Sequence, residues 1–199
     1  MARIEGVPEE NAKLGVKLVY WLTRRRLRTV PQTFKVSAQS PWVLGGVMLF
    51  RLCFERFRLV DAKLLSLAEL KAALLIGCPF CVDIISALSK AKGVTDEQRR
   101  DLMRYKDSAA FSPLERLVIE YAARMSTTPV DVPDALYEEL KRHFSPPELV
   151  ELTAAIAWEN YRARFNHALG MEAEGFARRA ACEIPLSQAG RAASHPSMP

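Results

Sequence analysis

The fold is indicated most clearly by one stretch of sequence, Ile76-Gly77-Cys78-Pro79-Phe80-Cys81-Val82-Asp83. Pro79 has no backbone N–H and would clash with the carbonyl four residues earlier, so it suits the first turn of a helix and not its interior. The Gly77-Cys78-Pro79 sequence therefore predicts that one helical segment ends here and another begins. Two cysteines three positions apart lie on neighbouring parts of one helical face, where they can close a small disulfide ring.

A helix start also favours reactive cysteines. Unpaired backbone N–H groups and the positive end of the helix dipole both stabilise a thiolate, which is the nucleophilic form of cysteine. We therefore expect reversible dithiol chemistry at Cys78 and Cys81, provided that an oxidant dissolved in the solvent reaches both sulfurs. The competing interpretation is two small buried hydrophobic side chains on a core helix. Cys53 and Cys182 belong to no second pair, so we expect no zinc site, no other metal and no cofactor.

Composition is that of an ordinary globular protein. The chain has 199 residues, 49% hydrophobic and 26% charged, which fits one domain or one domain with extensions. The net charge of +5 is concentrated at residues 24–28, which we interpret as a solvated helix end and not as a nucleic-acid surface. The apolar runs 43–50 and 72–82 are too short to span a membrane, and the polar, acidic N-terminus is unlike a signal peptide. We expect a cytoplasmic protein.

Helix starts recur along the chain, whereas strand signals are poor, so the predicted fold class is all-α. Helix-capping residues are expected at Asp61, Thr95, Ser112 and Ser145. We expect helices over residues 12–28, from 40 towards 58, from 61 into the cysteine pair, over 82–92, from 95, from 112, over 133–144 and from 145 to 169. Residues 30–39 are expected to form a connector around Pro31. In the first helix Leu14, Leu18, Tyr20, Trp21 and Leu22 indicate an amphipathic helix with a basic end. Helical flanks on both sides of the cysteine pair argue against a thioredoxin fold, in which the pair follows a strand.

With the cysteine pair placed on a helix, two segments resemble the carboxymuconolactone decarboxylase-like superfamily, and more closely its alkyl hydroperoxide reductase D-like (AhpD-like) branch. The first segment is residues 64–93, with the core Leu75-Ile76-Gly77-Cys78-Pro79-Phe80-Cys81-Val82-Asp83-Ile84. The second is residues 152–170, which include Thr153-Ala154-Ala155-Ile156-Ala157-Trp158-Glu159-Asn160-Tyr161-Arg162-Ala163-Arg164-Phe165-Asn166-His167. The resemblance implies an all-helical, AhpD-like subunit over residues 60–177 that assembles into trimers or hexamers. Residues 1–59 would then be an N-terminal helical extension, and we expect residues 178–199 to be a disordered tail.

The resemblance also implies a thiol-dependent peroxidase. In that scheme Cys81 attacks a small-molecule hydroperoxide as a thiolate and becomes a sulfenic acid. Cys78 condenses with the sulfenic acid to form a disulfide, and a dithiol reductant protein regenerates the enzyme.

The chain departs from the branch at the two positions that activate the thiol. Ile85 stands where the branch usually has a histidine, and Ser66 stands where it usually has a glutamate. Three substitute bases are candidates: Glu69, one helical turn after Ser66; Asp83, just after Cys81; and His167 from the second matching segment.

The second segment carries two polar stripes at helical spacing, Glu159-Arg162-Asn166 and Asn160-Arg164-His167. We interpret them as a hydrogen-bonded structural network, with Glu159 as a further candidate base.

Two other functions remain open. A decarboxylase-type lyase would not need a cysteine pair. It would need a general acid or base and a cationic pocket, for which Arg162 and Arg164 are available. A redox-responsive oligomerisation module would bind partners without catalytic turnover.

Overall fold

The computed structural model describes residues 2–179, which are helical with turns and loops and contain no strand within that range. The predicted all-α class is confirmed. Over the described residues the chain forms two compact units, one comprising residues 2–57 with 168–172 and the other comprising residues 58–167 with 173–179. The C-terminal residues expected to form a disordered tail lie, from residue 180, outside the described range.

The first unit contains α1 (Leu14–Leu27), α2 (Gln32–Ser37) and α3 (Pro41–Phe54). Its core is formed by Ala12, Val16, Tyr20, Val30, Phe34, Ala38 and Leu44. The expected connector over residues 30–39 is wrong, because α2 occupies most of it. Pro31 precedes α2 with φ −57° and its carbonyl accepts the N–H of Phe34, so this proline starts a helix instead of preventing one.

The buried face of α1 also differs from the apolar pattern of its sequence. The buried residues of α1 are Val16, Tyr20 and Thr23, and its large exposed hydrophobic residues are Leu14, Leu18, Trp21 and Leu22. In α3 only Leu44 is buried, although the helix is strongly apolar. The first unit therefore exposes more hydrophobic surface than its helical periodicity predicts.

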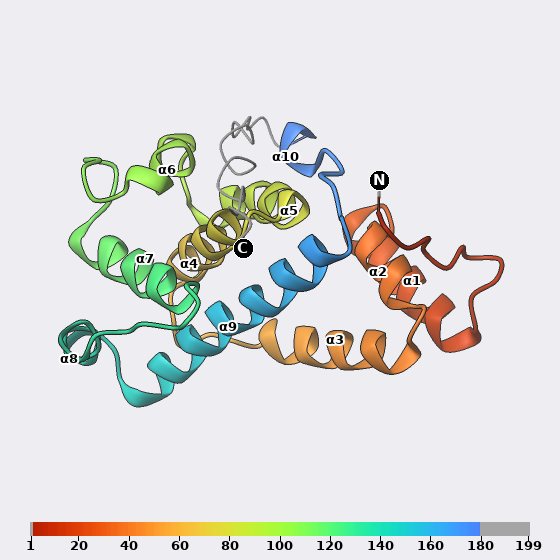
Figure 1. Ribbon diagram of the computed structural model, residues 1–199, viewed down its shortest axis with the longest axis horizontal. Coiled ribbons are helices and arrows are strands. Elements are labelled where there is room, and N and C mark those ends of the chain that lie inside the picture. Colours follow the sequence, from red (N-terminus) through yellow and green to blue (C-terminus); the bar gives the residue numbers. More distant parts are fainter. Residues whose placement is uncertain (1, 180–199) are drawn as a thin grey trace, which may run out of the picture. The chain divides into compact units, whose positions relative to one another are not determined.

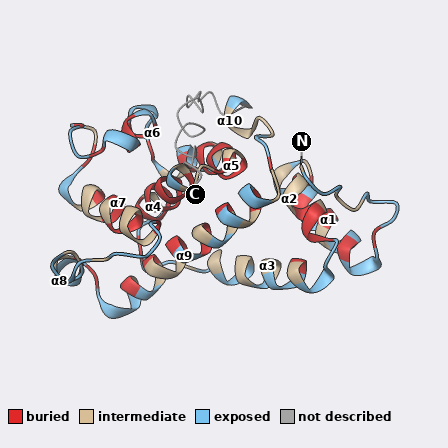
Figure 2. Ribbon diagram, in the orientation of Figure 1, coloured by how far each residue is buried: buried red, intermediate tan, exposed pale blue. Residues whose placement is uncertain are grey.

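The second unit is built around α4 (Ala62–Ile76), which packs against α5 (Pro79–Ser89) and α7 (Pro113–Met125). Five residues of α4, namely Leu67, Ala68, Leu70, Ala72 and Ala73, are completely buried, and Figure 2 shows the buried residues concentrated along α4 and α5. The other elements are η1 (Lys90–Lys92), α6 (Asp96–Asp101), η2 (Leu102–Arg104), α8 (Asp134–His143), α9 (Pro146–Ala168) and α10 (Phe176–Arg179). Figure 1 labels the α-helices.

Most of the predicted helix starts are confirmed in detail. The Asp61 carboxylate accepts the backbone N–H groups of Lys63 and Leu64, and Thr95 and Ser112 each form a complete capping box. Ser40 precedes α3, but its side chain makes no capping hydrogen bond. Gly93 ends η1 in the left-handed conformation that suits glycine, with φ 86°.

Candidate active site

The break between α4 and α5 positions the two cysteines. Gly77, with φ 76°, ends α4 in the left-handed conformation, and Cys78 is the N-cap of α5 with Pro79 in the first turn. The Cys78 Sγ accepts the backbone N–H of Cys81 at 3.2 Å. This confirms the predicted helix break, and it puts one sulfur on an N–H group that the helix leaves unpaired.

Both cysteines are reduced and buried. Cys78 is 0% exposed and Cys81 is 2% exposed. Burial raises the pKa of the Cys81 thiol, and the interaction with Cys78 raises it further. The positive charge of Arg162 and a hydrogen bond from Asn166 Nδ2 to Cys81 Sγ, 3.4 Å long, act in the opposite direction. For Cys81 the expected preference for thiolate is therefore wrong in this resting state, because desolvation outweighs the helix start.

One face of α9 lies against the cysteine pair and α4. Glu159, Arg162 and Asn166 follow one another at helical spacing on this face, as the first polar stripe predicted. Arg162 Nε donates to Glu159 Oε2 at 2.9 Å, and Arg162 Nη2 lies 3.4 Å from Glu69 Oε1 on α4. Glu69 Oε2 lies 3.8 Å from Lys92 Nζ. Two carboxylates therefore share one guanidinium, and the chain of charges continues to a lysine whose side chain is 34% exposed.

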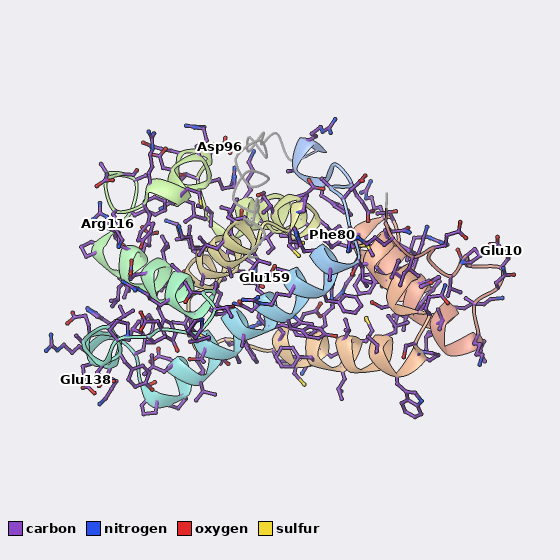
Figure 3. The ribbon with its side chains drawn as sticks, in the orientation of Figure 1. Glu10, Phe80, Asp96, Arg116, Glu138 and Glu159 are labelled. Atoms are coloured by element: carbon purple, nitrogen blue, oxygen red, sulfur yellow. The ribbon has the colours of Figure 1, made fainter. Side chains whose placement is uncertain are left out.

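Glu159 differs from the other charged residues of this network. It is completely buried, and its Oε1 has no hydrogen-bond partner among the described residues. Figure 3 shows Glu159 on α9 and Phe80 on α5. Burial raises the pKa of the Glu159 carboxyl well above its ordinary value; Arg162 opposes this rise, and Cys81 and Glu69 add to it. A carboxyl group in this environment binds a proton more readily than one in water.

The second polar stripe of α9 points to other partners. Asn160 Nδ2 donates to Ser126 Oγ at 3.0 Å, and Arg164 Nη2 donates to Thr128 Oγ1 at 3.0 Å. His167 is exposed, and its Nδ1 lies 2.9 Å from the carbonyl oxygen of Gly77. This stripe therefore holds α9 against the loop after α7 and against the end of α4.

Asp83 anchors the chain that follows α9. Its two carboxylate oxygens accept backbone N–H groups from Glu174, Phe176 and Ala177, at 2.9, 2.9 and 2.7 Å. Phe176 also makes an edge-to-face contact with Phe80, with the ring centroids 6.3 Å apart. Residues 173–177, which we call the cover segment, are thereby held against the first turns of α5.

The structure thus brings together only some of the residues that the sequence proposed. Cys78, Cys81 and Glu69 lie in or beside the α9 network, whereas Asp83 and His167 form hydrogen bonds with backbone atoms. Asn166 as a donor to a cysteine was not predicted, although its place seven residues after Glu159 on the same face could have indicated it.

The remaining cysteines lie elsewhere. Cys53 is exposed on α3 of the first unit, and Cys182 lies outside the described residues. Within the described part of the chain, no group of three or more His, Cys, Asp or Glu side chains could hold a metal ion. None of the described helices is both long and apolar enough to cross a membrane.

Comparison with known proteins places these features in a family. The carboxymuconolactone decarboxylase family model matches residues 48–124. YnjA, an uncharacterized protein of Escherichia coli (strain K12), is 35% identical over 166 residues, which cover 83% of this chain and 88% of YnjA. The apo structure of the debrominase Bmp8 is similar with a TM-score of 0.77 and 19% identity over 89% of this chain and 95% of Bmp8. An AhpD-core, peroxidase-related protein from Ralstonia eutropha JMP134 has a TM-score of 0.79 and 14% identity over 88% of this chain and 94% of its own.

Proposed function

Because the chain belongs to the carboxymuconolactone decarboxylase family and has an AhpD-like fold, we propose that it is a dithiol oxidoreductase that reduces hydroperoxides at Cys78 and Cys81. The observation that carries this proposal is the position of the two thiols on one turn of α5, where Cys78 Sγ accepts the Cys81 N–H and Cys81 Sγ accepts from Asn166. A purely structural pair of buried cysteines would not require a charged network beside it.

The reaction converts two thiols and one hydroperoxide into a disulfide, an alcohol and water. The Cys81 thiolate attacks the terminal oxygen of the hydroperoxide, the O–O bond breaks, and the alkoxide takes a proton to leave as the alcohol. The resulting Cys81 sulfenic acid is attacked by Cys78, which releases water and forms the disulfide. A dithiol partner then reduces the disulfide by exchange and is itself oxidised.

Substrate access requires a local rearrangement, because neither sulfur is exposed. The cover segment is held to α5 by three backbone hydrogen bonds to Asp83 and by the Phe80–Phe176 contact. We propose that its release from α5 admits the substrate. Short segments held by a few contacts open at a lower free energy than the core of a domain.

The test compares hydroperoxide consumption by the reduced full-length protein and its variants. We expect the wild-type chain to consume one tert-butyl hydroperoxide for each pair of thiols, and to turn over when dithiothreitol is supplied. Cys81→Ser should abolish consumption, whereas the exposed Cys53→Ser serves as the matched control and should leave it unchanged. Consumption at the wild-type rate by Cys81→Ser would reject the proposal.

The order of attack is tested separately. If Cys81 attacks first, Cys78→Ser should stop at a Cys81 sulfenic acid that dimedone traps, and Cys81→Ser should give no adduct after the same treatment. A dimedone adduct on Cys78 in the Cys81→Ser variant would reverse the two roles.

Two alternative functions make different predictions in the same preparation. A carboxymuconolactone lyase activity should survive replacement of both cysteines. A redox-responsive oligomerisation module should change its assembly on oxidation while consuming no more than one equivalent of hydroperoxide in the presence of dithiothreitol.

We also propose that the chain assembles into a homo-oligomer, with a trimer or hexamer as the prediction. Each of α1 and α3 exposes several large hydrophobic side chains, and this supports the proposal because exposed apolar surface often marks interaction sites. Light scattering after size-exclusion chromatography tests it. Trp42→Lys, at a residue that is 92% exposed, should weaken the assembly if α3 contributes to the interface.

A further inference from the structure

We propose that Glu159 is the proton acceptor of the Cys81 thiol, acting from α9 where related chains use residues on the cysteine-bearing helices. This inference rests on the proposed function. The positions that would supply the usual base are occupied by Ser66 and Ile85, and neither side chain accepts a proton near neutral pH. A thiol whose own environment disfavours the thiolate needs another group to take its proton.

Geometry selects Glu159 from the carboxylates of the second unit. It is 0% exposed, and Arg162, which it pairs with, lies one helical turn before Asn166, the donor to Cys81 Sγ. Its Oε2 is used by Arg162, but its Oε1 has no partner among the described residues. A buried carboxylate oxygen without a hydrogen bond is costly, and such a group is expected where a proton is gained and lost.

The other buried side-chain oxygens without partners support the same location. Within the described residues they are Ser66 Oγ on α4 and Ser86 Oγ on α5. All three therefore lie on the helices that form the site, α4, α5 and α9. Unpaired buried polar atoms are uncommon in folded proteins, and each of these three helices carries one.

The other candidate bases are already occupied. Glu69 is paired with Arg162 and Lys92, one on each oxygen. Asp83 uses both oxygens to hold the cover segment, and His167 contacts the Gly77 carbonyl. Glu69 and Asp83 would have to accept the proton on an oxygen that already has a partner, whereas Glu159 Oε1 would not. His167 is exposed, whereas Glu159 and Cys81 are both buried.

The proton of the Cys81 thiol stays within the site until the alcohol leaves. Glu159 takes the proton from the Cys81 thiol as the thiolate forms. After the thiolate has attacked the hydroperoxide, Glu159 returns this proton to the alkoxide, which leaves as the alcohol. Glu159 is then ionised again beside Arg162, and the disulfide forms from Cys78 without a further base.

If Glu159 and Cys81 share a proton, the reactivity of Cys81 should depend on pH in a characteristic way. The charged and titratable groups that influence the pKa of Glu159 are Arg162 on its own helix, Cys81 on α5 and Glu69 on α4, and Lys92 pairs with Glu69. Because Glu159 and Cys81 interact, they lose their two protons in two macroscopic steps that belong to the pair. Between the two steps one proton is shared, and a fraction of Cys81 is thiolate at a level that does not change with pH. Its reactivity should therefore show an intermediate plateau.

The experiment measures the rate at which iodoacetamide alkylates Cys81 in the reduced full-length protein, resolved by peptide mass spectrometry, as a function of pH. The range extends from below the ordinary pKa of a carboxyl to above that of a thiol. We expect two steps for the wild-type chain. Glu159→Gln keeps the shape of the side chain but cannot accept the proton, so the plateau should disappear and one step should remain. A fall of at least tenfold is expected in the plateau region, which corresponds to about 1.4 kcal/mol.

Glu69→Gln is the matched control, because it removes the other carboxylate from Arg162. It should retain two steps. A single step in the wild-type chain would overturn the proposal without any variant, so the test does not depend on whether Glu159→Gln folds. Faster alkylation in Glu159→Gln, or equal changes in both variants, would also overturn it, since Glu159 would then act only through its charge. Loss of hydroperoxide reduction in Cys81→Ser tests the proposed function independently.

Discussion

Two clusters in the second unit each pair a glutamate with basic side chains, two for Glu120 and one for Glu159, and they shift the pKa of the carboxyl group in opposite directions. Glu120 on α7 accepts from Arg124 Nε at 2.8 Å, from Lys106 Nζ at 2.9 Å and from the Tyr105 hydroxyl. Burial raises the pKa of Glu120, but these three donors outweigh it and hold the pKa at about 2. Glu159 has one cation, one free oxygen and complete burial, and its pKa moves upward.

The pKa values of Glu120 and Glu159 differ because the two carboxyl groups differ in the number of hydrogen-bond donors per oxygen and in access to solvent. Each Glu120 oxygen has a donor and the side chain is 20% exposed, so the charged form is well stabilised. Glu159 shares Arg162 with Glu69 and has no contact with solvent. A carboxylate paired like Glu120 stabilises the fold, whereas one like Glu159 can exchange a proton at little cost. Salt bridges in this unit therefore do not have one common role.

The largest expected effect comes from removing the shared guanidinium. Arg162→Met would leave Glu159 and Glu69 facing each other in a buried site, so we expect a loss of about 4 kcal/mol in the free energy of unfolding at neutral pH. Urea denaturation measures this loss. It should shrink at acidic pH, where Glu159 becomes protonated and the repulsion between the two carboxylates falls.

Arg124→Met is the control for that measurement. Its side chain is 40% exposed and Glu120 keeps two other donors, so the loss should stay below about 1 kcal/mol. Equal losses in the two variants would show that the clusters do not differ in the way described.

Lys71 is a buried lysine that forms no ion pair with a carboxylate among the described residues. It is 3% exposed; its Nζ lies 3.5 Å from the Leu102 carbonyl oxygen and 4.8 Å from the centre of the Tyr105 ring. Burial lowers the pKa of Lys71 from 10.5 to about 8, against the attraction of Glu120. The unfolded chain therefore binds more protons between these two values, and stability should rise as pH increases from 8 to 10.5.

Lys71→Met should remove that rise. At about 1.4 kcal/mol per pH unit, the lost pH dependence amounts to at most about 3.5 kcal/mol, and the variant should be more stable than the wild type near pH 7. Thermal unfolding at several pH values measures both effects. An unchanged pH dependence in Lys71→Met would mean that Lys71 is charged throughout.

Asp83 is a third kind of buried carboxylate, held by neutral donors. Asp83→Ala removes three hydrogen bonds from the cover segment, and we expect a loss of about 2 kcal/mol, smaller than the effect of Arg162→Met. If the cover segment controls access, iodoacetamide should modify Cys78 and Cys81 faster in this variant. Asp101→Ala, which affects a carboxylate on α6, is the control and should leave the alkylation rates unchanged.

Much of the fold could be predicted from the sequence because the helix boundaries are encoded locally. Asp61, Thr95 and Ser112 cap the helices they precede, and Gly77 with Pro79 separates α4 from α5, as residue type alone indicates. The predictions are wrong where tertiary packing decides which side of a helix is buried. The sequence of α1 indicates Tyr20 as one of its apolar residues, but it does not reveal that Val16 is buried while Leu14 is exposed.

The site could be predicted only in part for the same reason. The cysteine pair and the stripe from Glu159 to Asn166 are visible as spacings, but which face of α9 meets α5 is a property of packing. The helix start favours thiolate locally, and only the structure shows that burial of Cys81 reverses this preference. Likewise, nothing local distinguishes Asp83, which binds backbone N–H groups, from a base beside Cys81.

The smallest expected effect tests the Glu120 cluster at acidic pH. The pKa of Glu120 in the folded chain is about 2, below its ordinary value of 4.5, so its contribution to stability is complete above pH 4.5 and is lost as pH falls toward 2. Tyr105→Phe removes one of the three donors and should raise this pKa toward 4.5. We therefore expect a loss of about 1 kcal/mol near neutral pH and a smaller further loss on acidification than in the wild type. Denaturation at neutral and acidic pH measures both. If Tyr105→Phe destabilises the chain equally at the two pH values, the hydroxyl acts through packing alone, and the donor count does not explain why Glu120 and Glu159 differ.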